Sequence, residues 1–112
     1  MAYIKSCPTP YIRDGVIVWS EGDIFTLNFE LDLKDMDGET VILNDTSTVT
    51  VLVRRLNGEI IKKFTSSGSN SIAINFDKET TEFFARGQYY YDITVNNDYR
   101  VTVVNDQKMI VR

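Results

Sequence analysis

The chain has 112 residues, of which 43% are apolar and 25% are charged, and this mix suits one globular domain with a single core. Its formal net charge is −4 and no basic run exceeds two residues, so a phosphate-binding face for nucleic acid is not expected. With no histidine and one cysteine, Cys7, the chain lacks the residues for an intramolecular disulfide, a Ser–His–Asp or Cys–His site, or a zinc centre.

The chain is predicted to begin with an irregular arm over residues 1–10, which are mostly polar and include Pro8 and Pro10. This region has no apolar core of the kind that a signal peptide needs, and no stretch approaches the ~20 apolar residues of a membrane span. No repeat, linker or low-complexity stretch follows, so we place one domain at residues 11–112.

Beyond the arm, apolar residues alternate with period two, which predicts strands with one face on a core. The clearest case covers 23–33, where the apolar side chains of one face are Phe25, Leu27, Phe29, Leu31 and Leu33. The same alternation predicts strands over 49–53, 72–76, 89–95 and 99–103. Short apolar runs at 16–19 and 109–111 are the expected first and last strands, and 40–43 and 59–64 are weaker candidates.

Turn signals separate these segments. Asn57-Gly58 predicts a hairpin with a type I′ turn, and further turns are expected at 37–38, 96–98 and 105–106. Residues 66–70 are expected to form a plain, flexible polar loop.

One segment, near 78–86, breaks the alternation and predicts a short helical turn. Asp77 can cap its first N–H groups and Gly87 can end it in the left-handed conformation, while Phe83 and Phe84 offer apolar surface to one end of the sheets. Short strands separated by turns every ten residues or so are typical of sandwiches and barrels. The predicted fold is therefore all-β: an immunoglobulin-like antiparallel β-sandwich of about 7–9 strands with one short helical turn.

Three motifs carry a resemblance to a known group of proteins. They are Gly22-Asp23-Ile24-Phe25-Thr26-Leu27, Asp35-Met36-Asp37-Gly38, and Gly87-Gln88-Tyr89-Tyr90-Tyr91-Asp92. In this order the chain resembles, over about residues 20–112, the immunoglobulin-like modules of tailed-phage baseplate and tail proteins, in particular the N-terminal domain of upper baseplate proteins. The last motif also resembles the tyrosine corner of immunoglobulin sandwiches, with Tyr89 as the corner tyrosine.

The resemblance implies a virion structural protein of a phage or prophage tail or baseplate. It would be made in the bacterial cytoplasm without a signal peptide and would act by docking through strand edges, the N-terminal arm or one sheet face. Its implied partners are other tail or baseplate subunits, with copies of itself as an open alternative, and neither nucleic acid nor membrane. We expect no cofactor and no enzymatic activity.

Exposed aromatic side chains are the candidate interface residues. On the alternation, Tyr90 points away from the core, and Tyr11, Trp19 and Tyr99 are further candidates. The alternative function is a carbohydrate-binding or cell-surface adhesion module, which needs a row of such aromatics or a calcium-ordered loop. The best oxygen-rich loop contains Asp32, Asp35, Asp37 and Glu39, but it lacks the spacing of a calcium loop, so a hairpin turn is the preferred interpretation.

Overall fold

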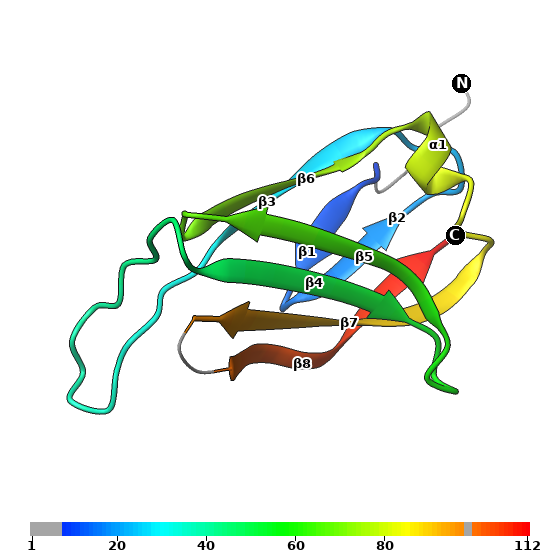
Figure 1. The fold of residues 1–112 in the computed structure, drawn as a ribbon. Helices are drawn as coiled ribbons and strands as arrows, with labels where there is room; N and C mark the ends of the chain where they lie inside the picture. Colours follow the sequence, from blue (N-terminus) through cyan, green and yellow to red (C-terminus); the bar gives the residue numbers. More distant parts are fainter. Residues whose placement is uncertain (1–7, 98–99) are drawn as a thin grey trace, which may run out of the picture.

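A computed structural model describes residues 8–97 and 100–112 of the chain, which form eight strands and one short helix (Figure 1). Cys7 and Tyr99 lie outside the described residues. In chain order the elements are β1 (Tyr11–Arg13), β2 (Val16–Trp19), β3 (Phe25–Glu30), β4 (Thr48–Arg54), β5 (Ile60–Ser67), β6 (Ser71–Phe76), α1 (Lys78–Thr81), β7 (Gly87–Asn96) and β8 (Arg100–Val111).

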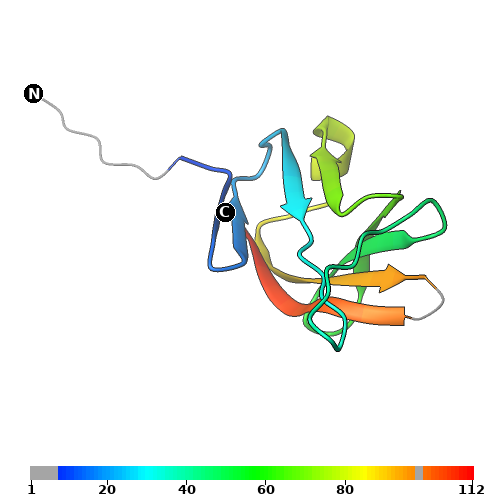
Figure 2. The ribbon, with the colours of Figure 1, turned by 90° about the vertical axis from the view of Figure 1, so that its left-hand side faces the viewer.

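The strands form two sheets that pack face to face. The larger sheet has the order β1-β2-β8-β7-β4-β5, and the smaller contains β3 and β6. Neighbours are antiparallel except β2 and β8, which run parallel. Figure 2 shows β3 and β6 as one layer over β4, β7 and β8, with the β1–β2 hairpin at the side. The order β8-β7-β4-β5 opposite β3-β6 corresponds to strands G-F-C-C′ opposite B-E of an immunoglobulin sandwich.

The core lies between the sheets and follows the period-two prediction. The inward residues include Leu27, Val49, Val51, Val53, Ile72, Ile74, Phe76, Tyr89, Tyr91, Ile93 and Val95, all of them buried. Burying a large apolar side chain contributes about 1.5–3 kcal/mol, so this set supplies the main driving force for the fold. The all-β sandwich that the alternation predicted is therefore confirmed.

Trp19 corrects one prediction about the surface. It is not an exposed interface residue, because its exposed fraction is 0%. Its indole packs against the rings of Phe25, Phe76 and Phe84 at centroid distances of 5.4, 5.6 and 5.3 Å. The run at 16–19 does not alternate clearly, so the sequence did not reveal which face of β2 turns inward.

The tyrosine corner is present. The Tyr89 hydroxyl donates a hydrogen bond to the carbonyl oxygen of Ala85 at 2.7 Å, which ties the start of β7 to the segment after α1. Two residues on, the Tyr91 hydroxyl donates to the carbonyl oxygen of Gly15 in the β1–β2 turn. Burial raises the pKa of the Tyr91 phenol above its ordinary value.

The helix is shorter than the sequence predicted. The Asp77 carboxylate accepts a hydrogen bond from the backbone N–H of Thr80 at 2.8 Å, as an N-cap does, and this contact lowers the pKa of Asp77. α1 then ends at Thr81, so Gly87 does not cap it and is instead the first residue of β7. Phe84 is buried, whereas Phe83 is 54% exposed.

Two predicted turns also differ. Gly58 has a positive φ of 91° but Asn57 does not, so the β4–β5 hairpin is not closed by a type I′ turn. The Gly58 N–H donates to the carbonyl oxygen of Arg55 at 3.0 Å, the pattern of a type I turn followed by a left-handed residue. Residues 105–106 do not reverse the chain: Asp106, with φ 58°, forms a bulge inside the continuous strand β8.

Candidate functional site

The two described aromatic candidates that reach the surface do not form a row. Tyr90 lies on the outer face of the larger sheet, and its hydroxyl accepts a hydrogen bond from the Gln88 side chain at 2.9 Å. Tyr11 lies in the edge strand β1, where its hydroxyl accepts from Arg112 at 2.9 Å. Strands β2 and β8 separate the two tyrosines. With Trp19 buried, the described residues supply no line of adjacent aromatic rings for a sugar.

An ion-pair network occupies the outer face beside Tyr90. The Arg54 guanidinium contacts Asp92 at 3.0 Å and also contacts Asp106, and it lies 5.6 Å from the centre of the Tyr90 ring. The bulge at Asp106 turns the backbone N–H of this residue toward Asp92, whose carboxylate accepts a hydrogen bond from it at 2.8 Å. Arg54 and Asp92 are 20% and 15% exposed, so the network is partly shielded from solvent. Sequence reasoning missed it because three strands bring these residues together.

A shallow hollow of about 470 Å³ adjoins this network, and its walls are mainly threonine, asparagine and charged side chains, with Leu52 and Ile60, from β4, β5, β7 and β8. Asp92 is already held by Arg54, and no histidine exists to activate a nearby hydroxyl. Within the described ranges, no three histidine, cysteine or carboxylate side chains gather closely enough to hold a metal ion. The network links β4, β7 and β8 through their side chains on the outer face of the larger sheet.

The most distinctive surface lies at the end of the sandwich where β3 connects to β4. The connecting segment, residues 31–47, extends beyond the sheets (Figure 1), and we call it the acidic loop. Beside its base is a hollow of about 590 Å³ with mainly apolar walls, to which Leu33, Met36, Val41, Leu43, Val95, Val101 and Val103 contribute. Met36 is fully exposed and Ile42 is 80% exposed.

The tip of the acidic loop is a tight turn, as the sequence predicted for Asp37-Gly38. The Asp35 carboxylate accepts hydrogen bonds from the backbone N–H groups of Asp37 and Glu39, both at 2.9 Å. Lys34 and Thr40 form a single antiparallel bridge below it. The weak strand candidate at 40–43 is therefore not a strand, and Asp35 serves to cap the turn.

Asn70 fixes the base of the acidic loop. Its side-chain amide donates to the carbonyl oxygens of Leu31 at 3.1 Å and Val41 at 2.9 Å, and its side-chain oxygen accepts from the N–H of Leu43 at 2.8 Å. The Asn70 backbone carbonyl also accepts from the N–H of Leu31. The prediction of a plain, flexible loop at 66–70 is therefore wrong: β5 runs to Ser67, and Asn70 holds both arms of the loop in place.

Comparison with known proteins identifies no relative of this chain: no family model, curated protein or solved structure matches it. No helix in the described ranges has the length and apolar content that a membrane crossing requires. The most distinctive feature of the described surface is the acidic loop, which carries exposed apolar side chains at one end of the sandwich.

Proposed function

We propose that this chain is a structural subunit or module of a phage or prophage tail, at the baseplate, and that it acts by protein–protein docking. The resemblance of its motifs to baseplate modules supplies the context, and the immunoglobulin-like strand order is compatible with it. A partner would be another tail or baseplate subunit, and the chain would reside in the virion.

The observation that supports docking is the exposed apolar surface of the acidic loop. Met36 is fully exposed and borders the apolar hollow, and Ile42, which is 80% exposed, borders a second hollow beside Gly68 and Ser69. Exposing large apolar side chains to water is unfavourable, and clustered exposure is a common sign of an interaction site. The Asn70 contacts hold this surface in one geometry before a partner arrives, which lowers the entropy cost of binding.

The glycan-binding alternative has less support. A sugar ring stacks on the open face of an aromatic ring. The Arg54 guanidinium lies over the Tyr90 ring, and strands β2 and β8 separate Tyr90 from Tyr11, so these described tyrosines form no platform of adjacent rings.

The test is incorporation into particles. Tail particles purified from the host bacterium are expected to contain the chain, detected by immunoblot and by cross-linking to a tail subunit. The double variant Met36→Ser/Ile42→Ser is expected to reduce incorporation at least tenfold, because each buried apolar side chain contributes about 1.5–3 kcal/mol and about 1.4 kcal/mol is already tenfold.

The matched control is Ile24→Ser, which removes a side chain that is 65% exposed and lies next to β3 at the opposite end from the acidic loop. It should leave incorporation unchanged. Absence of the chain from particles would contradict the proposal. Glycan binding that Tyr90→Ala abolishes would favour the carbohydrate-binding alternative instead.

A further inference from the structure

Charge is distributed unevenly along this molecule. The acidic loop contains five carboxylates and one lysine, a net charge of −4, which equals the formal net charge of the whole chain. The rest of the sequence is therefore balanced. The carboxylates are Asp32, Asp35, Asp37, Glu39 and Asp45, and all five residues are exposed.

The opposite sign gathers at the β4–β5 hairpin, residues 55–63, which we call the basic hairpin. It contains Arg55, Lys62 and Lys63 against the single carboxylate of Glu59, a net charge of +2. Arg54, which precedes it, is not counted because Asp92 and Asp106 pair with it from outside the hairpin. Arg55 pairs with Glu59 at 3.5 Å, and both of these residues are included in the sum. The hairpin also exposes large apolar side chains: Leu56 is 77% exposed and Ile60 is 60% exposed.

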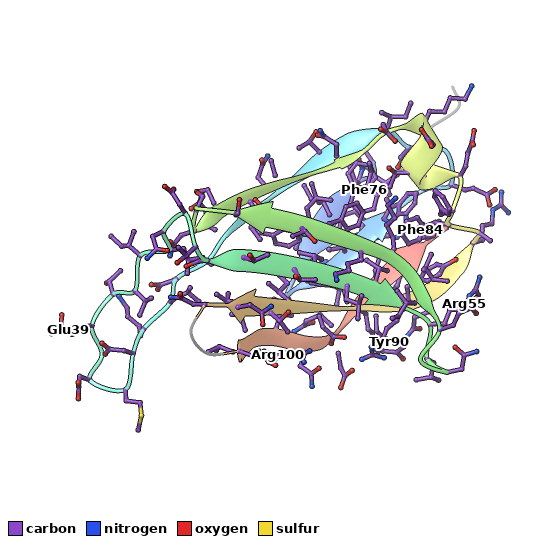
Figure 3. The ribbon with its side chains drawn as sticks, viewed as in Figure 1. Glu39, Arg55, Phe76, Phe84, Tyr90 and Arg100 are labelled. Carbon is purple, nitrogen blue, oxygen red and sulfur yellow. The ribbon has the colours of Figure 1, made fainter. Side chains whose placement is uncertain are left out.

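The two surfaces lie at opposite ends of the same strand. The acidic loop leads into β4 at Thr48, and the basic hairpin begins just after β4 ends at Arg54. A seven-residue strand spans about 23 Å, since each residue adds ~3.3 Å. Figure 3 places Glu39 and Arg55 at opposite ends of the molecule. One copy therefore cannot bring its own two surfaces together.

We propose that copies of this chain associate head to tail, with the acidic loop of one copy seated on the basic hairpin of the next. This inference rests on the proposed docking function and names the partner as a second copy. The acidic loop is negatively charged and the basic hairpin is positively charged, so the two surfaces attract. Each also has exposed apolar side chains that the contact would cover. A contact between two different surfaces is heterologous, so it builds a closed ring or an open filament rather than a two-fold dimer.

The test exchanges the charges of the two surfaces. The loop variant, Asp32→Lys/Asp37→Lys/Glu39→Lys, converts the acidic loop from −4 to +2 and keeps Asp35, which caps the turn. The hairpin variant, Arg55→Glu/Lys63→Glu, converts the basic hairpin from +2 to −2. Circular dichroism and thermal unfolding establish that each variant folds.

Association is measured by analytical ultracentrifugation over a wide concentration range at low salt. Wild-type protein is expected to show a mass that rises with concentration. Each variant alone carries like charges on both surfaces, so its association constant should fall at least tenfold. An equimolar mixture pairs the loop of each variant with the oppositely charged hairpin of the other, so it should regain association within about threefold of wild type. Raising salt from 0.01 to 1 M shortens the Debye length from about 30 to about 3 Å and should weaken wild-type association.

Three results would overturn the inference: wild-type protein that stays monomeric throughout, variants that associate as wild type does, or folded variants whose mixture does not regain association. These outcomes are separate from failure of the proposed function. A chain that is incorporated into particles but never self-associates refutes only the head-to-tail contact. A chain that self-associates but is absent from particles refutes the tail assignment.

Discussion

Asn70→Ala is the sharpest test of how the acidic loop is held. The substitution removes three side-chain hydrogen bonds, to Leu31, Val41 and Leu43, at donor–acceptor distances of 3.1, 2.9 and 2.8 Å. An intramolecular hydrogen bond contributes about 0.5–1.5 kcal/mol net, so the free energy of unfolding should fall by about 2–4 kcal/mol. The unfolding entropy is about 2.1 cal/mol/K per residue, or about 0.24 kcal/mol/K for this chain, so Tm should fall by about 8–17 °C.

The measurement is thermal unfolding followed by circular dichroism or calorimetry. Hydrogen exchange adds a local readout, because the N–H of Leu43 loses its acceptor and should exchange faster. The matched control is Asn75→Ala in β6, whose side chain accepts one exposed hydrogen bond from Thr26. Its Tm should change by less than about 4 °C.

Asn70→Asp tests the side-chain oxygen of Asn70, which accepts a hydrogen bond, separately from its side-chain NH₂ group, which donates two. The aspartate keeps an oxygen for the Leu43 N–H but turns a second oxygen, with negative charge, toward the carbonyls of Leu31 and Val41. It should therefore be at least as unstable as Asn70→Ala near neutral pH. If Asn70→Ala unfolds within about 3 °C of wild type, or no differently from Asn75→Ala, the assignment of Asn70 as the anchor of the loop is refuted.

Three further predictions concern the core aromatic residues. Trp19→Ala should lower the free energy of unfolding by about 3–5 kcal/mol in a urea titration, and a loss below 1 kcal/mol would contradict its central position. Tyr89→Phe removes the corner hydrogen bond to Ala85, so the same titration should show a loss of about 1–2 kcal/mol, whereas an unchanged midpoint would show that the corner adds no stability. Because burial raises the pKa of Tyr91 above 10.0, folding favours the protonated form of its phenol. The contribution of this preference to the free energy of unfolding is fully present below pH 10 and is lost as pH rises through the folded-state pKa. The free energy of unfolding should therefore decline less steeply above pH 10 in Tyr91→Phe than in wild type. Parallel curves of the two proteins against pH would refute the raised pKa of Tyr91.

The strand faces were predictable because side chains alternate across a strand whatever it packs against. Leu27 is buried and Phe25 and Phe29 pack against the core, as the spacing indicated. Asp77 caps a helix because its carboxylate needs only the next three residues. The tyrosine corner was equally local, since Tyr89 and Ala85 are four residues apart. Predictions of this kind depend on short separations along the chain.

The candidate site was mostly not predictable, because the residues that form it are far apart along the chain. Arg54, Asp92 and Asp106 meet only after three strands pair, and the bulge that turns the Asp106 N–H toward Asp92 arises from a mismatch in register. Asn70 reaches residues 27 to 39 positions away. Nothing in its neighbourhood of serines and glycine distinguished it from a residue of a plain loop.

The sequence by itself determined the class of fold, the inward faces of its main strands and the uneven distribution of charge, because these follow from residue type and spacing alone. Tertiary structure decided that Trp19 lies in the core, that Asn70 anchors the acidic loop, and that acidic and basic surfaces stand at opposite ends of β4. Those outcomes depend on which strands pair and in which register. Pairing is set by the summed burial of many side chains across two sheets, and no single segment of the chain carries that information.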